Sequence, residues 1–70
     1  MSHTAGPQVY RAVVHAEEEG GYWAEVPDLP GCFTQGDSLD EIYPNLLEAI
    51  ACHLGEDGAQ VRIGSLELAA

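Results

Sequence analysis

Alternation of apolar and polar residues in the first half of the chain predicts three β-strands. In the segment 8–16 every second side chain points to the same side, and the same period recurs over 22–26 and, more briefly, over 32–36. Along the first strand the two faces hold Tyr10, Ala12, Val14 and Ala16 on one side and Val9, Arg11, Val13 and His15 on the other.

The two connections between these strands are rich in turn-forming residues. The first reads EEEGG (17–21), in which the glycines allow positive φ and the carboxylates stay hydrated, as in a β-hairpin. The second reads PDLPG (27–31) and is stiffened by its prolines. A stiff loop loses little conformational entropy when a partner binds it, so this loop is a candidate contact surface.

A helix is predicted to begin after Asp37. Ser38 fits the N-cap position, Glu41 completes a capping box, and Gly55 fits the C-terminal stop. Pro44 lies beyond the first turn, where its missing N–H is expected to distort the helix. The apolar stripe of this helix consists of Leu39, Ile42, Leu46, Ile50 and Leu54.

The segment 60–68 predicts a final strand that is bulged or bent at Gly64, or two short strands divided there, and 56–58 a turn before it. The predicted fold class is α+β: an antiparallel three-stranded meander, one helix and a final strand. If the final strand runs parallel to the first, the two strands need a crossover connection, and the helix forms part of that crossover. Small side chains let a helix approach a sheet closely, which places the helix on the side of Cys32, Thr34 and Gly36.

A chain of 70 residues is long enough for one domain. We expect a flexible end over 1–8 and a single domain over 9–70. A domain this small buries only about 60% of the surface that its unfolded chain exposes. The cysteine spacing offers neither a disulfide framework nor a zinc site, so oligomerisation is the expected support. The absence of a signal-peptide or membrane-spanning stretch predicts a cytoplasmic protein with no membrane partner.

The charge of the chain is strongly negative, with Asp and Glu numbering 12 against 2 for Lys and Arg, and a formal net charge of −10 at pH 7. Nucleic-acid binding draws on Lys and Arg that neutralise phosphates, so direct binding to DNA or RNA is not expected. The charge suits a basic partner, although it also serves solubility alone.

The residues that could act as nucleophiles have structural explanations. Ser38 is better explained as a helix cap than as a catalytic serine. Cys32 follows a Pro-Gly loop in an acidic neighbourhood, and negative charge opposes thiolate formation. Cys52 lies between apolar helix positions and is expected to be partly buried.

The residues that could bind a metal do not converge in the sequence-based picture. His15 and His53 have no neighbouring ligand set of the kind that a metal requires. A nuclease with two metal ions needs several carboxylates around one pocket, and Glu25, Asp28 and Asp37 are not expected to meet. No catalytic residue, metal or cofactor is therefore predicted.

The face of the sheet opposite the helix carries a second apolar group, made of Val13, Trp23 and Phe33 on adjacent strands. Exposed apolar patches of this kind usually mark interfaces, and tryptophan is enriched at binding hot spots. The final strand or the tail could cover the patch within one chain. Burial between molecules is favoured, in an oligomer or against another protein, and the sequence does not choose between these two.

The longest recognisable pattern runs from Gly20 to Glu41. It combines a glycine turn followed by YWAEV, the loop PDLPGC and the helix start GDSLDE, in this order. This pattern resembles the signature of the HicB-like antitoxin domain, and the resemblance covers roughly Tyr10 to Leu54. It implies a β-β-β-α-β fold similar to part of a ribonuclease-H-like fold.

The resemblance implies a binding module and not an enzyme. HicB-like antitoxins neutralise HicA, a small basic toxin that cleaves messenger RNA, by covering its active site. Many also carry a C-terminal DNA-binding domain, which is not expected here because no basic segment follows. The alternative is an orphan member that self-assembles into a dimer or tetramer with another protein or a small ligand as partner. The expected partner contacts are Tyr22, Trp23, Asp28, Leu29, Pro30 and Phe33, and the expected oligomer interface is Val13, Trp23 and Phe33.

Overall fold

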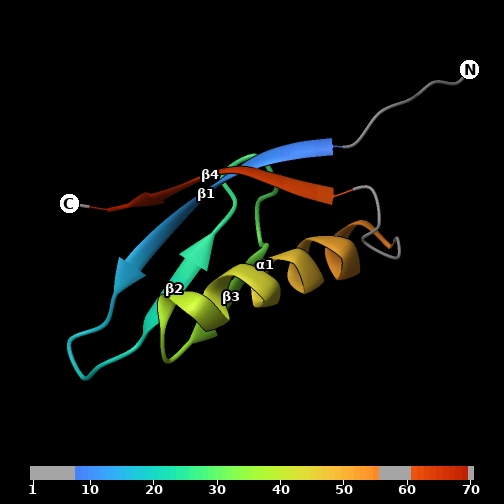
Figure 1. Ribbon diagram of the computed structural model, residues 1–70. Helices are drawn as coiled ribbons and strands as arrows, with labels where there is room; N and C mark the ends of the chain where they lie inside the picture. Colours follow the sequence, from blue (N-terminus) through green and yellow to red (C-terminus); the bar gives the residue numbers. More distant parts are fainter. Residues whose placement is uncertain (1–7, 56–60, 70) are drawn as a thin grey trace, which may run out of the picture.

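The computed structural model describes residues 8–55 and 61–69, which form a four-stranded mixed sheet and a helix (Figure 1). Of the predicted flexible end over 1–8, residues 1–7 lie outside the described residues, whereas Gln8 already belongs to the first strand; the predicted turn over 56–58 and Gln60 also lie outside the described residues. The elements follow the order β1 (Gln8–Ala16), β2 (Tyr22–Glu25), β3 (Phe33–Gly36), α1 (Leu39–Leu54) and β4 (Val61–Leu68).

The strands lie in the order β3-β2-β1-β4. β1 pairs antiparallel with β2, β2 pairs antiparallel with β3, and β4 pairs parallel with β1. The α+β class and the element order expected from the sequence are confirmed. β2 and β3 are each one residue shorter than predicted at the loop between them, ending at Glu25 and beginning at Phe33.

The hairpin between β1 and β2 closes through two backbone hydrogen bonds. The Glu17 N–H donates to the Gly21 carbonyl at 3.0 Å, and the Gly20 N–H donates to the Glu17 carbonyl at 3.1 Å. Gly20 and Gly21 have φ of 103° and 82°, a region that side-chain-bearing residues rarely occupy. The glycine turn expected from the sequence is therefore present.

Both ends of α1 are capped by the residues predicted for them. The Ser38 hydroxyl accepts a hydrogen bond from the Glu41 N–H at 3.3 Å, while the Glu41 carboxylate accepts one from the Asp37 N–H at 3.0 Å. Gly55 ends the helix in the left-handed conformation with φ of 75°. The helix continues through Pro44, which is exposed, so the carbonyl that loses its partner there can be hydrated.

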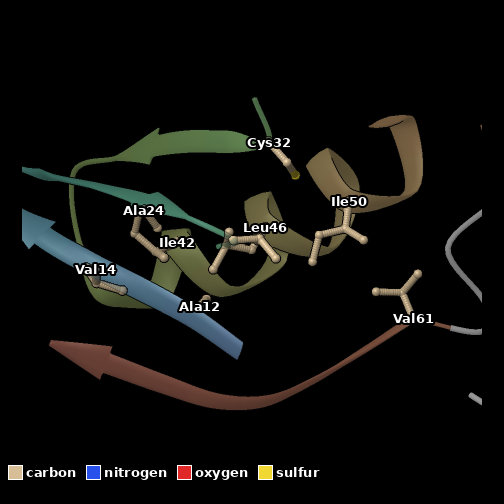
Figure 2. Close-up of a cluster of buried hydrophobic side chains, with 9 residues drawn as sticks. Ala12, Val14, Ala24, Cys32, Ile42, Leu46, Ile50 and Val61 are labelled. Atoms are coloured by element: carbon tan, nitrogen blue, oxygen red, sulfur yellow. The ribbon is translucent and has the colours of Figure 1, made fainter. Parts of the chain in front are cut away.

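The core lies between the sheet and one side of α1, with Ile42, Leu46 and Ile50 fully buried (Figure 2). The helix crosses the sheet diagonally: its first turn lies against Gly36 of β3, and Ile50 near its end faces Val61 of β4. A Cβ placed on Gly36 would lie 3.2 Å from the Glu41 Cβ, which confirms the close approach expected on this side. The core cluster comprises Ala12, Val14, Ala24, Val26, Cys32, Ile42, Leu46, Ile50 and Val61.

The ends of the predicted apolar stripe are less buried than its centre. Leu39 is 41% exposed in the first turn of α1, and Leu54 is half-buried. Cys52 was expected to be partly buried and is exposed, because it lies on the flank of α1 away from Ile50. Cys32 is buried in the core.

Gly64 forms the bulge that the sequence predicted in β4. Tyr10 pairs with Ile63 and Arg11 pairs with Ser65, so Gly64 is the extra residue between them. A Cβ at this position would lie 2.7 Å from Cγ1 of Val9, so the backbone passes Val9 where only glycine fits without a shift.

Replacement of Gly36 by valine will separate the helix from the sheet. The new Cβ meets backbone and side-chain atoms of Glu41 and Ile42, so we expect a loss of about 1–3 kcal/mol in the free energy of unfolding. The matched control is Gln35→Val, one residue earlier on the exposed face, which should change stability by no more than about 0.5 kcal/mol. Urea unfolding measures both, and equal losses would contradict the close-approach account.

The two thiols will react at different rates. Burial raises the pKa of the Cys32 thiol, and the charge of neighbouring Cys52 raises it further, so at neutral pH the reactive thiolate of Cys32 is scarce. We expect iodoacetamide to modify exposed Cys52 first, and Cys32 only after unfolding or at higher pH. Mass spectrometry of the intact protein follows the reaction. Loss of the fast phase should occur in Cys52→Ser and not in Cys32→Ser; the reverse result would contradict the assignment.

Candidate protein-binding surface

The face of the sheet turned away from α1 is uncovered within the described residues. We call it the open face; from β1, β2 and β3 it presents Val9, Arg11, Val13, His15, Trp23, Glu25, Phe33 and Gln35. Phe33 is 63% exposed and Val9 is 62% exposed, while Val13 and Trp23 are half-buried. Strand alternation predicted this grouping, and the side chains do lie on one face.

Trp23 is held in place by its neighbours on the open face. His15 pairs with Trp23 across β1 and β2, and their rings stack with centroids 4.1 Å apart and planes inclined by 10°. The His15 Nε2 lies 2.8 Å from a carboxylate oxygen of Glu25, which fixes the far side of the imidazole. The indole is thus positioned before any partner arrives, which lowers the entropy that binding must overcome.

A surface hollow lies beside this arrangement, where β2 meets β3. Trp23 and Phe33 supply apolar lining, and Glu17, Thr34 and Gln35 complete it. Phe33 pairs with Glu25 and Gln35 pairs with Trp23, so the two aromatic residues are diagonal neighbours across adjacent strands. An exposed aromatic hollow of this kind can receive an apolar or amphipathic side chain of another protein.

The end of the molecule next to this hollow is acidic. The hairpin tip and the start of α1 together line a second hollow, to which Glu17, Asp37 and Glu41 contribute carboxylates. Glu17 and Gln35 border both hollows, so the acidic end is continuous with the aromatic one. Among the described residues no group of three or more His, Cys, Asp or Glu is arranged to hold a metal ion.

The loop between β2 and β3 folds onto itself at the other end of these strands. The Leu29 N–H donates to the Val26 carbonyl and the Cys32 N–H donates to the Leu29 carbonyl, both at 2.9 Å. Leu29 is half-buried against the core, whereas Asp28 and Pro30 are exposed. The loop is therefore a rigid rim beside Phe33, as its prolines suggested.

The structure divides the residues that the sequence suggested as partner contacts. Trp23 and Phe33 share the open face, and Asp28, Leu29 and Pro30 adjoin Phe33 in the loop. Tyr22 is not on the open face: it pairs with Gly36 at the hairpin end, packs against the core on the helix side and lines the acidic hollow. His15 and Glu25, which hold Trp23 in place, were not among the expected contacts, although His15 and Trp23 stand at equal distances from the hairpin turn and therefore pair.

Comparison with known proteins gives UPF0150 relatives of similar size and a longer phage protein. A UPF0150 protein of Archaeoglobus fulgidus is 38% identical over 64 residues, covering 84% of this chain and 93% of the relative. A UPF0150 protein of Thermotoga maritima is 33% identical over 57 residues, covering 80% and 76%. An uncharacterized 14.9 kDa protein of Haemophilus phage HP1 is 53% identical over 34 residues, which are 49% of this chain and 26% of the phage protein.

No solved structure matches this chain. No helix of the described residues is long and apolar enough to cross a membrane. The family model described as "HicB_like antitoxin of bacterial toxin-antitoxin system" matches residues 10–67, which include all of β2, β3 and α1 and most of β1 and β4. The chain belongs to the HicB-like antitoxin family.

Proposed function

We propose that this chain is an antitoxin module that neutralises a small basic, mRNA-cleaving toxin of the HicA type by covering its active site. The supporting observation is the aromatic hollow of Trp23 and Phe33, which is continuous with the acidic end of the molecule. Family membership supports an antitoxin role and with it a toxin partner. The chain would act by binding and not by catalysis.

The aromatic hollow provides the anchor of the proposed contact. Trp and Tyr dominate binding energies because they bury a large rigid surface with few rotamers to fix. Trp23 is already fixed by its stack on His15, and Phe33 stands 63% exposed beside it. The stiff loop with Asp28 and Pro30 would form the rim on one side. Tyr22 faces the helix side and would take part at the acidic hollow, which it lines, and not at the aromatic one.

The acidic end provides the electrostatic part of the contact. A ribonuclease must attract phosphate groups, so its active site is expected to be lined by cationic or hydrogen-bond-donating side chains. Carboxylates that enter such a site would occupy the positions of RNA phosphates, and a chain of net charge −10 would be steered toward it at long range. The carboxylates at this end come from Glu17, Glu18, Glu19, Asp37, Asp40 and Glu41.

The proposed toxin acts on messenger RNA, so the complex would form in the cytoplasm.

The second candidate is an orphan family member that self-assembles through Val13, Trp23 and Phe33 and binds another protein or a small ligand. The same exposed residues favour it, since an apolar face needs an occupant of some kind.

A growth-rescue experiment will separate the two functions. The chain is co-expressed with the protein encoded next to it in its native genome, which the proposal requires to be small and basic. We expect that product alone to arrest growth and cleave messenger RNA, and co-expression of the chain to restore both growth and intact transcripts. A neighbouring product that is harmless, or an arrest that the chain does not relieve, would overturn the antitoxin proposal.

Truncation of the aromatic residues will abolish rescue without unfolding the chain. We expect Trp23→Ala and Phe33→Ala each to weaken the complex by about 2 kcal/mol or more, the usual cost at a hot spot, because both occupy the proposed anchor. Tyr43→Ala is the matched control, since Tyr43 is an aromatic residue, 44% exposed, on α1. Calorimetric titration with the purified toxin measures all three. A loss at Tyr43 alone would move the contact to the helix side.

A further inference from the structure

The two edges of the sheet are protected to different degrees. β3 spans only Phe33–Gly36, and the Asn45 side chain of α1 donates to the Gln35 carbonyl at 2.9 Å. β4 spans Val61–Leu68, contains no proline or lysine, and has no neighbouring strand on its outer side among the described residues. An edge of this length and composition is a template for pairing with another strand.

The helix side of this edge is apolar and incompletely covered. Leu66 pairs with Ala12 and Leu68 pairs with Val14, and both β1 residues are buried under α1. Because α1 crosses diagonally toward Val61, it leaves the far end of β4 open: Leu66 is 39% exposed and Leu68 is 66% exposed. Figure 1 shows β4 as the strand that leads to the C-terminus.

The bulge makes the side-chain pattern of β4 symmetric about its centre. Val61 and Ile63 belong to the core side, while the missing Cβ of Gly64 would point at Val9 on the open face. Ser65 pairs with Arg11, so its side chain also points to the open face. Adjacent residues at a bulge can share a side in this way. From residue 61 to residue 68 the side chains point in turn to the core side, open face, core side, open face, open face, core side, open face and core side. The order is the same when the strand is read from 68 to 61.

When two such strands pair antiparallel, core-side residues can stand opposite core-side residues and open-face residues opposite open-face residues. Around a two-fold axis between Gly64 and Ser65, Val61 stands opposite Leu68 of the second copy, and Ile63 stands opposite its Leu66. On the open face Arg62 stands opposite Glu67 of the second copy, beside the Arg11–Glu67 contact of 3.5 Å within each copy. Without the bulge this register would place apolar residues opposite polar ones.

We propose that β4 is a self-association edge, through which a second copy of this chain pairs antiparallel in that register to form a continuous eight-stranded sheet. The charge distribution favours a second copy as the occupant. Both arginines of the chain lie on β1 and β4, whereas the acidic helix start follows β3 at the opposite edge of the sheet. Pairing through β4 therefore keeps the acidic helix starts of two copies of net charge −10 far from each other, which limits their repulsion.

The first test is the mass of the purified chain by light scattering. We expect twice the chain mass of 7.5 kDa for the unaltered protein, and Leu68→Lys to raise the dissociation constant at least tenfold. Leu68 is exposed enough for lysine to be tolerated, which circular dichroism verifies. Phe33→Lys makes the same change on the open face and should leave the dimer intact. A monomeric unaltered chain, or dissociation by Phe33→Lys alone, would overturn the proposal.

The second test is the register. In the proposed pair, Ser65 of each copy lies beside the two-fold axis, within the Cα separation of about 4.4–6.8 Å that a disulfide spans. In a Cys52→Ser background we expect Ser65→Cys to give a disulfide-linked dimer under mild oxidation, and Gln35→Cys, on the opposite edge, to remain monomeric on a non-reducing gel. Equal cross-linking at both positions would overturn the register.

Discussion

The structure depends on one packing constraint, which is the coverage of a four-stranded sheet by a single helix. An α-helix with its side chains is about 10–12 Å wide, while strands lie about 4.8 Å apart, so one helix covers little more than two strands. Here α1 begins against Gly36 of β3 and ends over Val61 of β4. The diagonal path lets one stripe of Ile42, Leu46 and Ile50 bury residues from the whole sheet.

That constraint also determines which surfaces remain uncovered. No second helix lies over the open face within the described residues, so Trp23 and Phe33 stay accessible there. The diagonal path leaves the last residues of β4 uncovered on the helix side, so Leu66 and Leu68 stay exposed as well. The two surfaces differ in character, because the first adjoins the acidic hairpin tip, whereas the second presents Leu66 and Leu68 along the edge strand β4. This difference is the reason for assigning them to different partners.

Features set by local sequence were predictable, and features set by the helix path were not. Strand alternation gave the two faces of the sheet, and Ser38, Glu41 and Gly55 marked the ends of the helix correctly. The bulge at Gly64 followed from a break in alternation. By contrast, the exposure of Leu66, Leu68 and Cys52 depends on where α1 crosses the sheet, which no local pattern specifies.

The candidate site shows the same division. Trp23 and Phe33 could be placed on one face from their spacing, yet the His15 stack and the Glu25 contact that hold the indole required the hairpin register. Likewise, the acidic hairpin tip and the acidic start of α1 are separate in the sequence and meet only because β3 leads back to the hairpin end. Tyr22 and Trp23 are adjacent on β2 and face opposite sides of the sheet, so Trp23 lines the aromatic hollow and Tyr22 the acidic one.

The two proposed surfaces are compatible with simultaneous use. Pairing through β4 keeps both copies in one sheet, and a two-fold axis perpendicular to that sheet leaves both open faces on the same side. The hollow at β2 and β3 lies more than two strand spacings from the β4 edge, so the hollows of the two copies would be roughly 25–30 Å apart. This separation leaves room for a small protein on each copy, and the β4 pairing supplies the additional core that a 70-residue chain lacks.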